Sequence, residues 1–185
     1  MRKNFLFISL FSAAFLERVV FDFGANIELV TTAMILSTFY LGKKKGLILT
    51  FLILLVTDLI LGNTLIFLFT WSGFLIPIVF LRPKLFARNK ILKHLSYGIL
   101  AGFGSNLFFF LWTNFGVWLL DSWGMYSRDF SGLLHSYINA LPFLKMQLIS
   151  SLVFIPTGIL GIEIFTRCLR VNFIQSRKFR VAMER

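Results

Sequence analysis

The sequence is poor in the residues on which most enzymes and secreted domains depend. It has one cysteine, Cys168, which excludes an intrachain disulfide. Neither of its two histidines, His94 and His135, has another metal-ligating residue at a useful spacing. GxSxG, HExxH and P-loop motifs are absent. The sequence therefore gives no support to an enzyme, a metal centre or a resident cofactor, and transport driven by ATP would need another subunit.

Charged residues are also scarce, whereas apolar residues are abundant. The chain of 185 residues is 57% hydrophobic and contains 24 phenylalanines, with a mean hydropathy of +0.81. A soluble domain of this size could not bury so much apolar surface. The pattern predicts an all-α membrane protein, a six-transmembrane-helix bundle formed by residues 1–166 and followed by a basic tail, 167–185. The six apolar segments are residues 5–21, 27–41, 46–61, 64–81, 95–112 and 144–165.

The net charge of +11 does not point to nucleic acid, because the basic residues alternate with the apolar segments. Sixteen of the 19 lysines and arginines fall on one side: two before the first segment, three after the second, five after the fourth and six after the last. The other side has only Arg18, Arg128 and Lys145. The positive-inside rule therefore predicts a multi-pass membrane protein with both termini in the cytoplasm.

The first segment has a second interpretation. Arg2 and Lys3, a short apolar run and Ser12-Ala13-Ala14 also fit a cleaved signal peptide. The apolar character that returns after Glu17 and Arg18 favours a retained span. The orientation of the later spans is the same in both cases.

Polar residues inside the apolar segments gather toward the outer side. Asp58 and Asn106 lie at similar depths in the third and fifth segments, and Glu28 opens the second. Ionisable side chains in hydrocarbon normally face a cavity or a partner. Asp58 is therefore expected either to pair with Arg18, to cap the chain near Asn63, or to face a ligand cavity. Small residues repeat four apart at Gly98 and Gly102 and again at Ser9 and Ala13, which predicts close helix packing.

The segment from Thr113 to Phe143 cannot lie in hydrocarbon, since it is rich in polar and aromatic residues. We expect it to fold over the bundle as an outer lid, with a short helix over 132–140 that Ser131 caps and Pro142 ends. The tryptophans also fit an ordinary interfacial belt. As a binding site, the predicted cavity suits a planar neutral or cationic compound. Its candidate substrate-binding residues are Glu28, Asp58, Asn106, Trp112, Asn114, Trp118, Tyr126, His135 and Tyr137.

Three stretches resemble an uncharacterised bacterial family of integral-membrane transport proteins. They are NIELVTTAMILSTFYLGKKKGLILTFLILLVTDLILGN, LFFFLWTNFGVWL and MYSRDFSGLLHSYINALPF, which together span most of residues 26–143. That family is in turn similar to the S components, the substrate-binding membrane subunits, of energy-coupling factor (ECF) transporters.

The resemblance implies a subunit that binds a vitamin or similar small molecule at its outer end. Its implied partners are the membrane lipid, the substrate and a transmembrane coupling subunit with ATPases. In that family the coupling subunit docks on a face of small residues on the first helix. In this sequence Ser9 and Ala13 are the only faint trace of that face. The alternative from another class is a non-transporting membrane scaffold or assembly protein that uses its basic cytoplasmic face.

Overall fold

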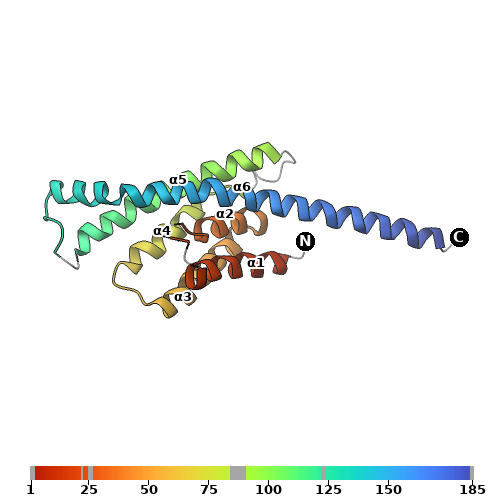
Figure 1. The fold of residues 1–185 in the computed structure, drawn as a ribbon, viewed down its shortest axis with the longest axis horizontal. Helices are drawn as coiled ribbons and strands as arrows, with labels where there is room; N and C mark the ends of the chain where they lie inside the picture. Colours follow the sequence, from red (N-terminus) through yellow and green to blue (C-terminus); the bar gives the residue numbers. More distant parts are fainter. Residues whose placement is uncertain (1–2, 22, 25–26, 84–90, 122–123, 184–185) are drawn as a thin grey trace.

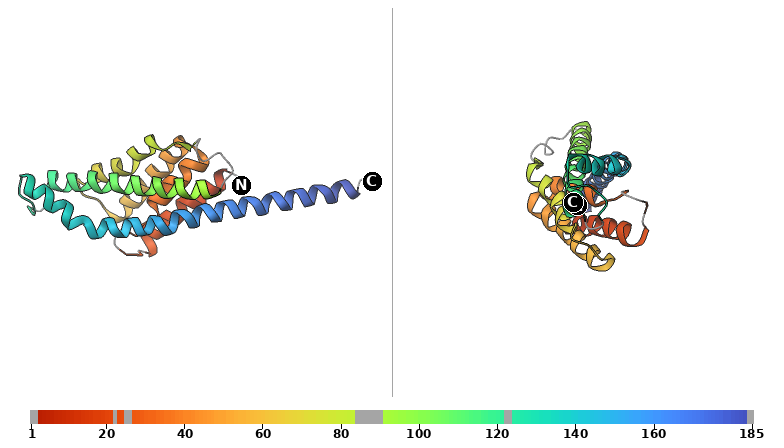
Figure 2. Two further views of the ribbon diagram at one scale, coloured as in Figure 1. Left: turned by 90° about the horizontal axis from the view of Figure 1, so that it is seen from above. Right: turned by 90° about the vertical axis from the view of Figure 1, so that its left-hand side faces the viewer.

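The computed structural model describes residues 3–21, 23–24, 27–83, 91–121 and 124–183, and the described residues form helices and no strand. Most helices are separated by short connections. In chain order the elements are α1 (Lys3–Leu16), a π-helical turn η1 (Glu17–Phe21), α2 (Val30–Leu41), α3 (Lys43–Leu61), α4 (Phe67–Phe80), α5 (Ile91–Leu120) and α6 (Phe130–Met183). The long helices α5 and α6 lie side by side, and α1 to α4 pack together against one side of that pair (Figures 1 and 2).

Helix α2 is the centre of the bundle. It carries no charged residue, and its ten residues from Val30 to Phe39 are all buried. A helix buried on all sides has to be surrounded by other helices, and α2 contacts α1, α3, α4, α5 and α6. It ends at Gly42, whose φ of 93° disfavours a side chain and lets the chain turn directly into α3. The core therefore forms around α2, the shortest α-helix in the described part of the chain.

Small residues bring α5 and α6 close together. A Cβ added at Gly98 would lie 2.6 Å from Cδ1 of Ile159, and one at Gly102 would lie 2.5 Å from Cδ1 of Ile155. The predicted role of this glycine pair in close packing is therefore confirmed. Ser9 and Ala13 behave differently, because both are exposed on the surface of α1.

Three helical stretches are long and apolar enough to cross a membrane: Lys3–Phe21, Ile91–Leu120 and Phe130–Cys168. Helices α2 and α4 are apolar but have only 12 and 14 residues. At ~1.5 Å per residue they are about 18 and 21 Å long, shorter than a hydrocarbon core of roughly 30 Å. The described chain thus has the character of a helical membrane protein, with three helices that meet the length of a full span.

The predicted lid does not form as expected. Residues 113–120 continue α5 and residues 130–143 begin α6, so these residues lie toward the far end of a helical hairpin (Figure 1). Pro142 does not end the helix, because α6 continues for 54 residues from Phe130. A proline removes one backbone hydrogen bond, and packing against α5 along α6 outweighs that loss.

The cap of that helix was also assigned to the wrong residue. The Asp129 carboxylate accepts a 2.8 Å hydrogen bond from the backbone N–H of Gly132, so Asp129 and not Ser131 caps α6. A second bond, from the Ser127 hydroxyl at 2.7 Å, holds the same oxygen. These bonds, the one from Gly132 above all, lower the pKa of Asp129 from its usual value.

Candidate functional site: a polar cluster around Glu28

A polar stripe on α6 meets the start of α2. Gln147, Ser150 and Ser151 lie at spacings of three and four residues, so they share one face of the helix, and all are buried. The Ser150 hydroxyl donates to the backbone oxygen of Glu28 at 2.9 Å and lies 3.2 Å from the Glu28 backbone nitrogen, from which it accepts. Residues 28 and 150 are 122 positions apart in sequence. The stripe therefore fixes the backbone at Glu28 against α6.

The Glu28 carboxylate is held by neutral groups. Its Oε1 accepts from Nε2 of Gln147 at 3.1 Å and lies 3.4 Å from the hydroxyl of Thr31. No described lysine, arginine or histidine lies within the 4.0 Å ion-pair distance of this carboxylate. Its second oxygen, Oε2, has no hydrogen-bond partner among the described residues. One oxygen is thus positioned by the protein, and the other has no partner among the described residues.

Asn106 extends the cluster toward the core. It is fully buried, and its Nδ2 donates to the backbone oxygen of Gln147 at 3.0 Å and to the Ser151 hydroxyl at 2.8 Å. Its Oδ1 lies 3.2 Å from the hydroxyl of Thr31. The structure therefore joins two of the predicted site residues, Glu28 and Asn106, through Thr31.

The position of Thr31 leaves the cluster one hydrogen short. A threonine hydroxyl has a single hydrogen, but Oγ1 of Thr31 is within reach of two acceptors, Oε1 of Glu28 and Oδ1 of Asn106. If Glu28 is ionised, only one of the two receives that hydrogen. A proton on Glu28, or a hydrogen-bond donor or cation of a bound molecule, would supply the missing interaction to the second acceptor. The cluster is therefore suited to take up a positively charged or hydrogen-donating group.

Asp58 belongs to a different cluster. Its Oδ1 lies 2.7 Å from Nη2 of Arg18, and its Oδ2 accepts from Nε1 of Trp71 at 2.6 Å and from Nδ2 of Asn63. Of the alternatives that the sequence left open, Asp58 takes the ion pair with Arg18 and also binds Asn63. This network connects η1, α3 and α4. Both of its oxygens accept from protein groups, which is typical of a structural role.

The aromatic and polar residues of 113–143 do not share one network. Among the described residues, the side chains of Asn114, Trp118, Tyr126 and His135 form no hydrogen bond with one another. Asn114 donates to Phe110 of its own helix at 2.7 Å, Trp118 donates to the Ser127 backbone at 3.0 Å, and His135 is exposed.

The other aromatic candidates hold helices together. The Tyr137 hydroxyl donates to the Leu111 backbone at 3.1 Å, which connects α6 to α5. The Trp112 indole N–H donates to the Ser72 hydroxyl at 2.8 Å, which connects α5 to α4. The Tyr126 hydroxyl lies 3.5 Å from Nδ2 of Asn139. These contacts attach the hairpin to itself and to α4.

A further ionisable cluster lies on the opposite half of the bundle. The Tyr40 hydroxyl donates to Oε1 of Glu163 at 3.0 Å, and Nδ1 of His94 lies 3.3 Å from the same oxygen. These residues come from α2, α6 and α5, the same three helices that build the Glu28 cluster. The sequence analysis did not connect them, because their separations of 69 and 123 residues carry no local signal. A local signal was present for the polar stripe on α6, because Gln147, Ser150 and Ser151 are polar residues at helical spacing within an apolar segment.

Neither the curated proteins nor the solved structures give a match. Residues 1–170 match a family of unknown function, DUF6580, and the chain therefore belongs to that family.

Proposed function

We propose that this protein is the membrane-embedded substrate-binding subunit of an uptake system for a small molecule. In this proposal the chain crosses the bacterial inner membrane six times with both termini in the cytoplasm, as the distribution of lysine and arginine predicts. The substrate enters from the outer side and meets the Glu28 cluster.

The observation that carries the proposal is the chemistry of Glu28. A carboxylate in a membrane protein normally has a cation or a functional role. Asp58 forms an ion pair with Arg18, whereas no described cation lies within ion-pair distance of Glu28, on which the Arg18 charge acts from farther away. Gln147 and Thr31 hold Oε1 of Glu28, and no described residue bonds its Oε2. The cluster accordingly favours a substrate with a cationic or hydrogen-donating group. A phosphate-rich substrate is disfavoured, because the outer side has few basic residues.

The partner implied by the family resemblance is a transmembrane coupling subunit with ATPases. The chain has no P-loop of its own. On α1, Ser9 and Ala13 are exposed, and Ser9 lines a pocket of about 410 Å³ with Gly158 and Gly161. Small residues at a surface allow another helix to approach closely. This surface on α1 and α6 is where we place the coupling subunit.

The scaffold alternative has one observation in its favour. Helix α6 has 54 residues, so it is about 81 Å long, well over twice a hydrocarbon thickness of roughly 30 Å. Its C-terminal part extends past the rest of the protein in both views (Figures 1 and 2). An extended helix with Arg177, Lys178 and Arg180 in its sequence suits contact with an acidic partner or anionic lipid.

Mass spectrometry of small molecules extracted from the purified protein distinguishes the two functions. We expect a small molecule with an amine or another hydrogen donor to co-purify with the wild type and to be lost in Glu28→Gln, which keeps the size of the side chain and removes its charge. Glu163→Gln is the matched control, because it removes an acid from the other half of the bundle. Equal retention by wild type and Glu28→Gln would refute the assigned site. Failure of any small molecule to co-purify, together with capture of a specific partner through α6, would favour the scaffold.

A further inference from the structure

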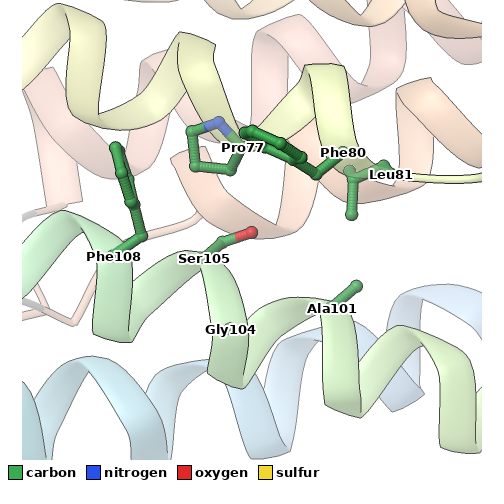
Figure 3. A pocket seen from close by; sticks show the side chains of 7 residues that line it. All are labelled: Pro77, Phe80, Leu81, Ala101, Gly104, Ser105 and Phe108. Atoms are coloured by element: carbon green, nitrogen blue, oxygen red, sulfur yellow. The ribbon is translucent and has the colours of Figure 1, made fainter.

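Besides the pocket between α1 and α6, another pocket lies between α4 and α5, away from the Glu28 cluster. It has a volume of about 290 Å³ and is lined by Pro77, Phe80, Leu81, Ala101, Gly104, Ser105 and Phe108. Figure 3 shows the α4 residues on one side and the α5 residues facing them. Phe80 is 74% exposed and Gly104 is also exposed, so the pocket opens on the outer surface of the bundle. In a membrane, such an opening faces the lipid.

One polar group projects into this apolar space. Ser105 is only 6% exposed, and its hydroxyl has no hydrogen-bond partner among the described residues. In Figure 3 the hydroxyl is directed across the pocket toward α4. Other serines in these helices bind the backbone oxygen four residues earlier, as Ser72 and Ser96 do. Ser105 is largely buried, but its hydroxyl opens into the apolar pocket, where a hydroxyl without a hydrogen-bond partner is unfavourable. The geometry therefore points to an acceptor supplied by a bound molecule.

A basic residue follows the lining of the pocket directly in sequence. Arg82 directly follows the lining residue Leu81, is exposed, and forms no ion pair with a described residue. It opens the basic segment 82–93, which the charge pattern places in the cytoplasm. A molecule in this pocket therefore has apolar walls along its length, a hydrogen-bond donor at Ser105 and a cation at its cytoplasmic end.

We propose that the pocket binds one anionic glycerophospholipid of the cytoplasmic leaflet. The phosphate lies near Arg82, an ester carbonyl accepts the hydrogen bond of Ser105, and the acyl chain follows Gly104 toward Phe108. The order of these groups matches the order of a phospholipid, in which the ester carbonyls lie just below the phosphate and above the chain. A free polar solute does not fit, since Ser105 is the only polar side chain among the described residues of the lining. This inference does not depend on the proposed function of the Glu28 cluster.

The test measures lipid retention by the full-length protein with native mass spectrometry, after reconstitution in phosphatidylglycerol or phosphatidylcholine nanodiscs. A Cβ at Gly104 would meet nothing within 4 Å, so Gly104→Leu places a side chain in the open pocket. Gly161→Leu is the matched control, because Gly161 has the same free space but lines the pocket between α1 and α6. We expect Gly104→Leu to abolish retention of the bound phosphatidylglycerol and Gly161→Leu to preserve it.

Two further variants keep the test decisive if Gly104→Leu fails to fold. Loss of one hydrogen bond in Ser105→Ala should weaken retention of both lipids roughly two- to tenfold. Arg82→Gln should remove the preference for phosphatidylglycerol over phosphatidylcholine and leave acyl-chain binding in place. Equal retention in wild type, Ser105→Ala and Gly104→Leu would overturn the assignment. Loss of a protein oligomer in Gly104→Leu without loss of lipid would also overturn it, because the occupant would then be a helix of a second protein chain.

Discussion

Replacing Asp58 by asparagine removes the negative charge from the network that connects η1, α3 and α4. The side chain of Asp58 is 7% exposed and that of Arg18 is 22% exposed. An asparagine has one acceptor oxygen, whereas the carboxylate now receives donors from Arg18, Trp71 and Asn63. At least one of these donors loses its partner, and the Arg18 guanidinium loses its counter-charge.

The expected cost follows from these two losses. Removing one member of a buried ion pair costs about 3–5 kcal/mol, because the other charge stays in a poorly solvated place. Arg18 keeps some contact with solvent, so we expect the lower end, about 3 kcal/mol. The free energy of unfolding in mixed detergent–SDS micelles measures this change. Leu59→Ala is the control: Leu59 is next to Asp58 but 77% exposed, and its truncation should change the free energy by less than about 0.5 kcal/mol.

A double-mutant cycle separates the ion pair from the loss of hydrogen bonds. Arg18→Gln should cost less than Asp58→Asn, because the Asp58 carboxylate keeps the donors of Trp71 and Asn63. The double variant should be less destabilised than the sum of the single variants, with a coupling of at least about 1 kcal/mol. A cost below 1 kcal/mol for Asp58→Asn, or strict additivity, would show that the pair does not hold these helices together.

Two other predictions concern the α5–α6 loop and the topology. Since the folded-state pKa of Asp129 is lowered, its cap should stabilise the start of α6 above the unfolded-state pKa of about 3.9 and weaken as the pH falls through the lower folded value. Amide hydrogen exchange at Gly132, corrected for its intrinsic pH dependence, should therefore accelerate in acid. Asp129→Asn should abolish this acceleration, and an acceleration that persists in the variant would contradict the assignment of Asp129 as the cap. In a Cys168→Ser background, an impermeant thiol reagent applied to intact cells should label a cysteine at Ser127 and not one at Lys93; labelling at Lys93 would refute the orientation.

The apolar segments show which helix boundaries local sequence patterns predict and which they do not. The predicted ends of the second and third segments, Leu41 and Leu61, are the ends of α2 and α3, whereas both predicted starts differ from the observed starts by three residues. The three lysines from Lys43, which were expected to separate the two segments, lie in the first turn of α3. The prediction failed at Pro142, where a residue that usually stops a helix lies inside α6. Whether a helix continues past a proline depends on what it packs against, and that information is not local.

Composition and spacing by themselves determined that the chain is helical, that it belongs in a membrane, which ends of its segments are basic, and that Gly98 and Gly102 pack closely. The tertiary structure alone decided which polar residues meet. Glu28 and Asp58 look alike in sequence, as acids near the outer side. In the structure Asp58 forms an ion pair with Arg18, whereas the Glu28 carboxylate accepts hydrogen bonds from Gln147 and Thr31. The physical reason is that a carboxylate's role depends on the charges and donors within a few ångströms, and here these come from helices up to 119 residues away.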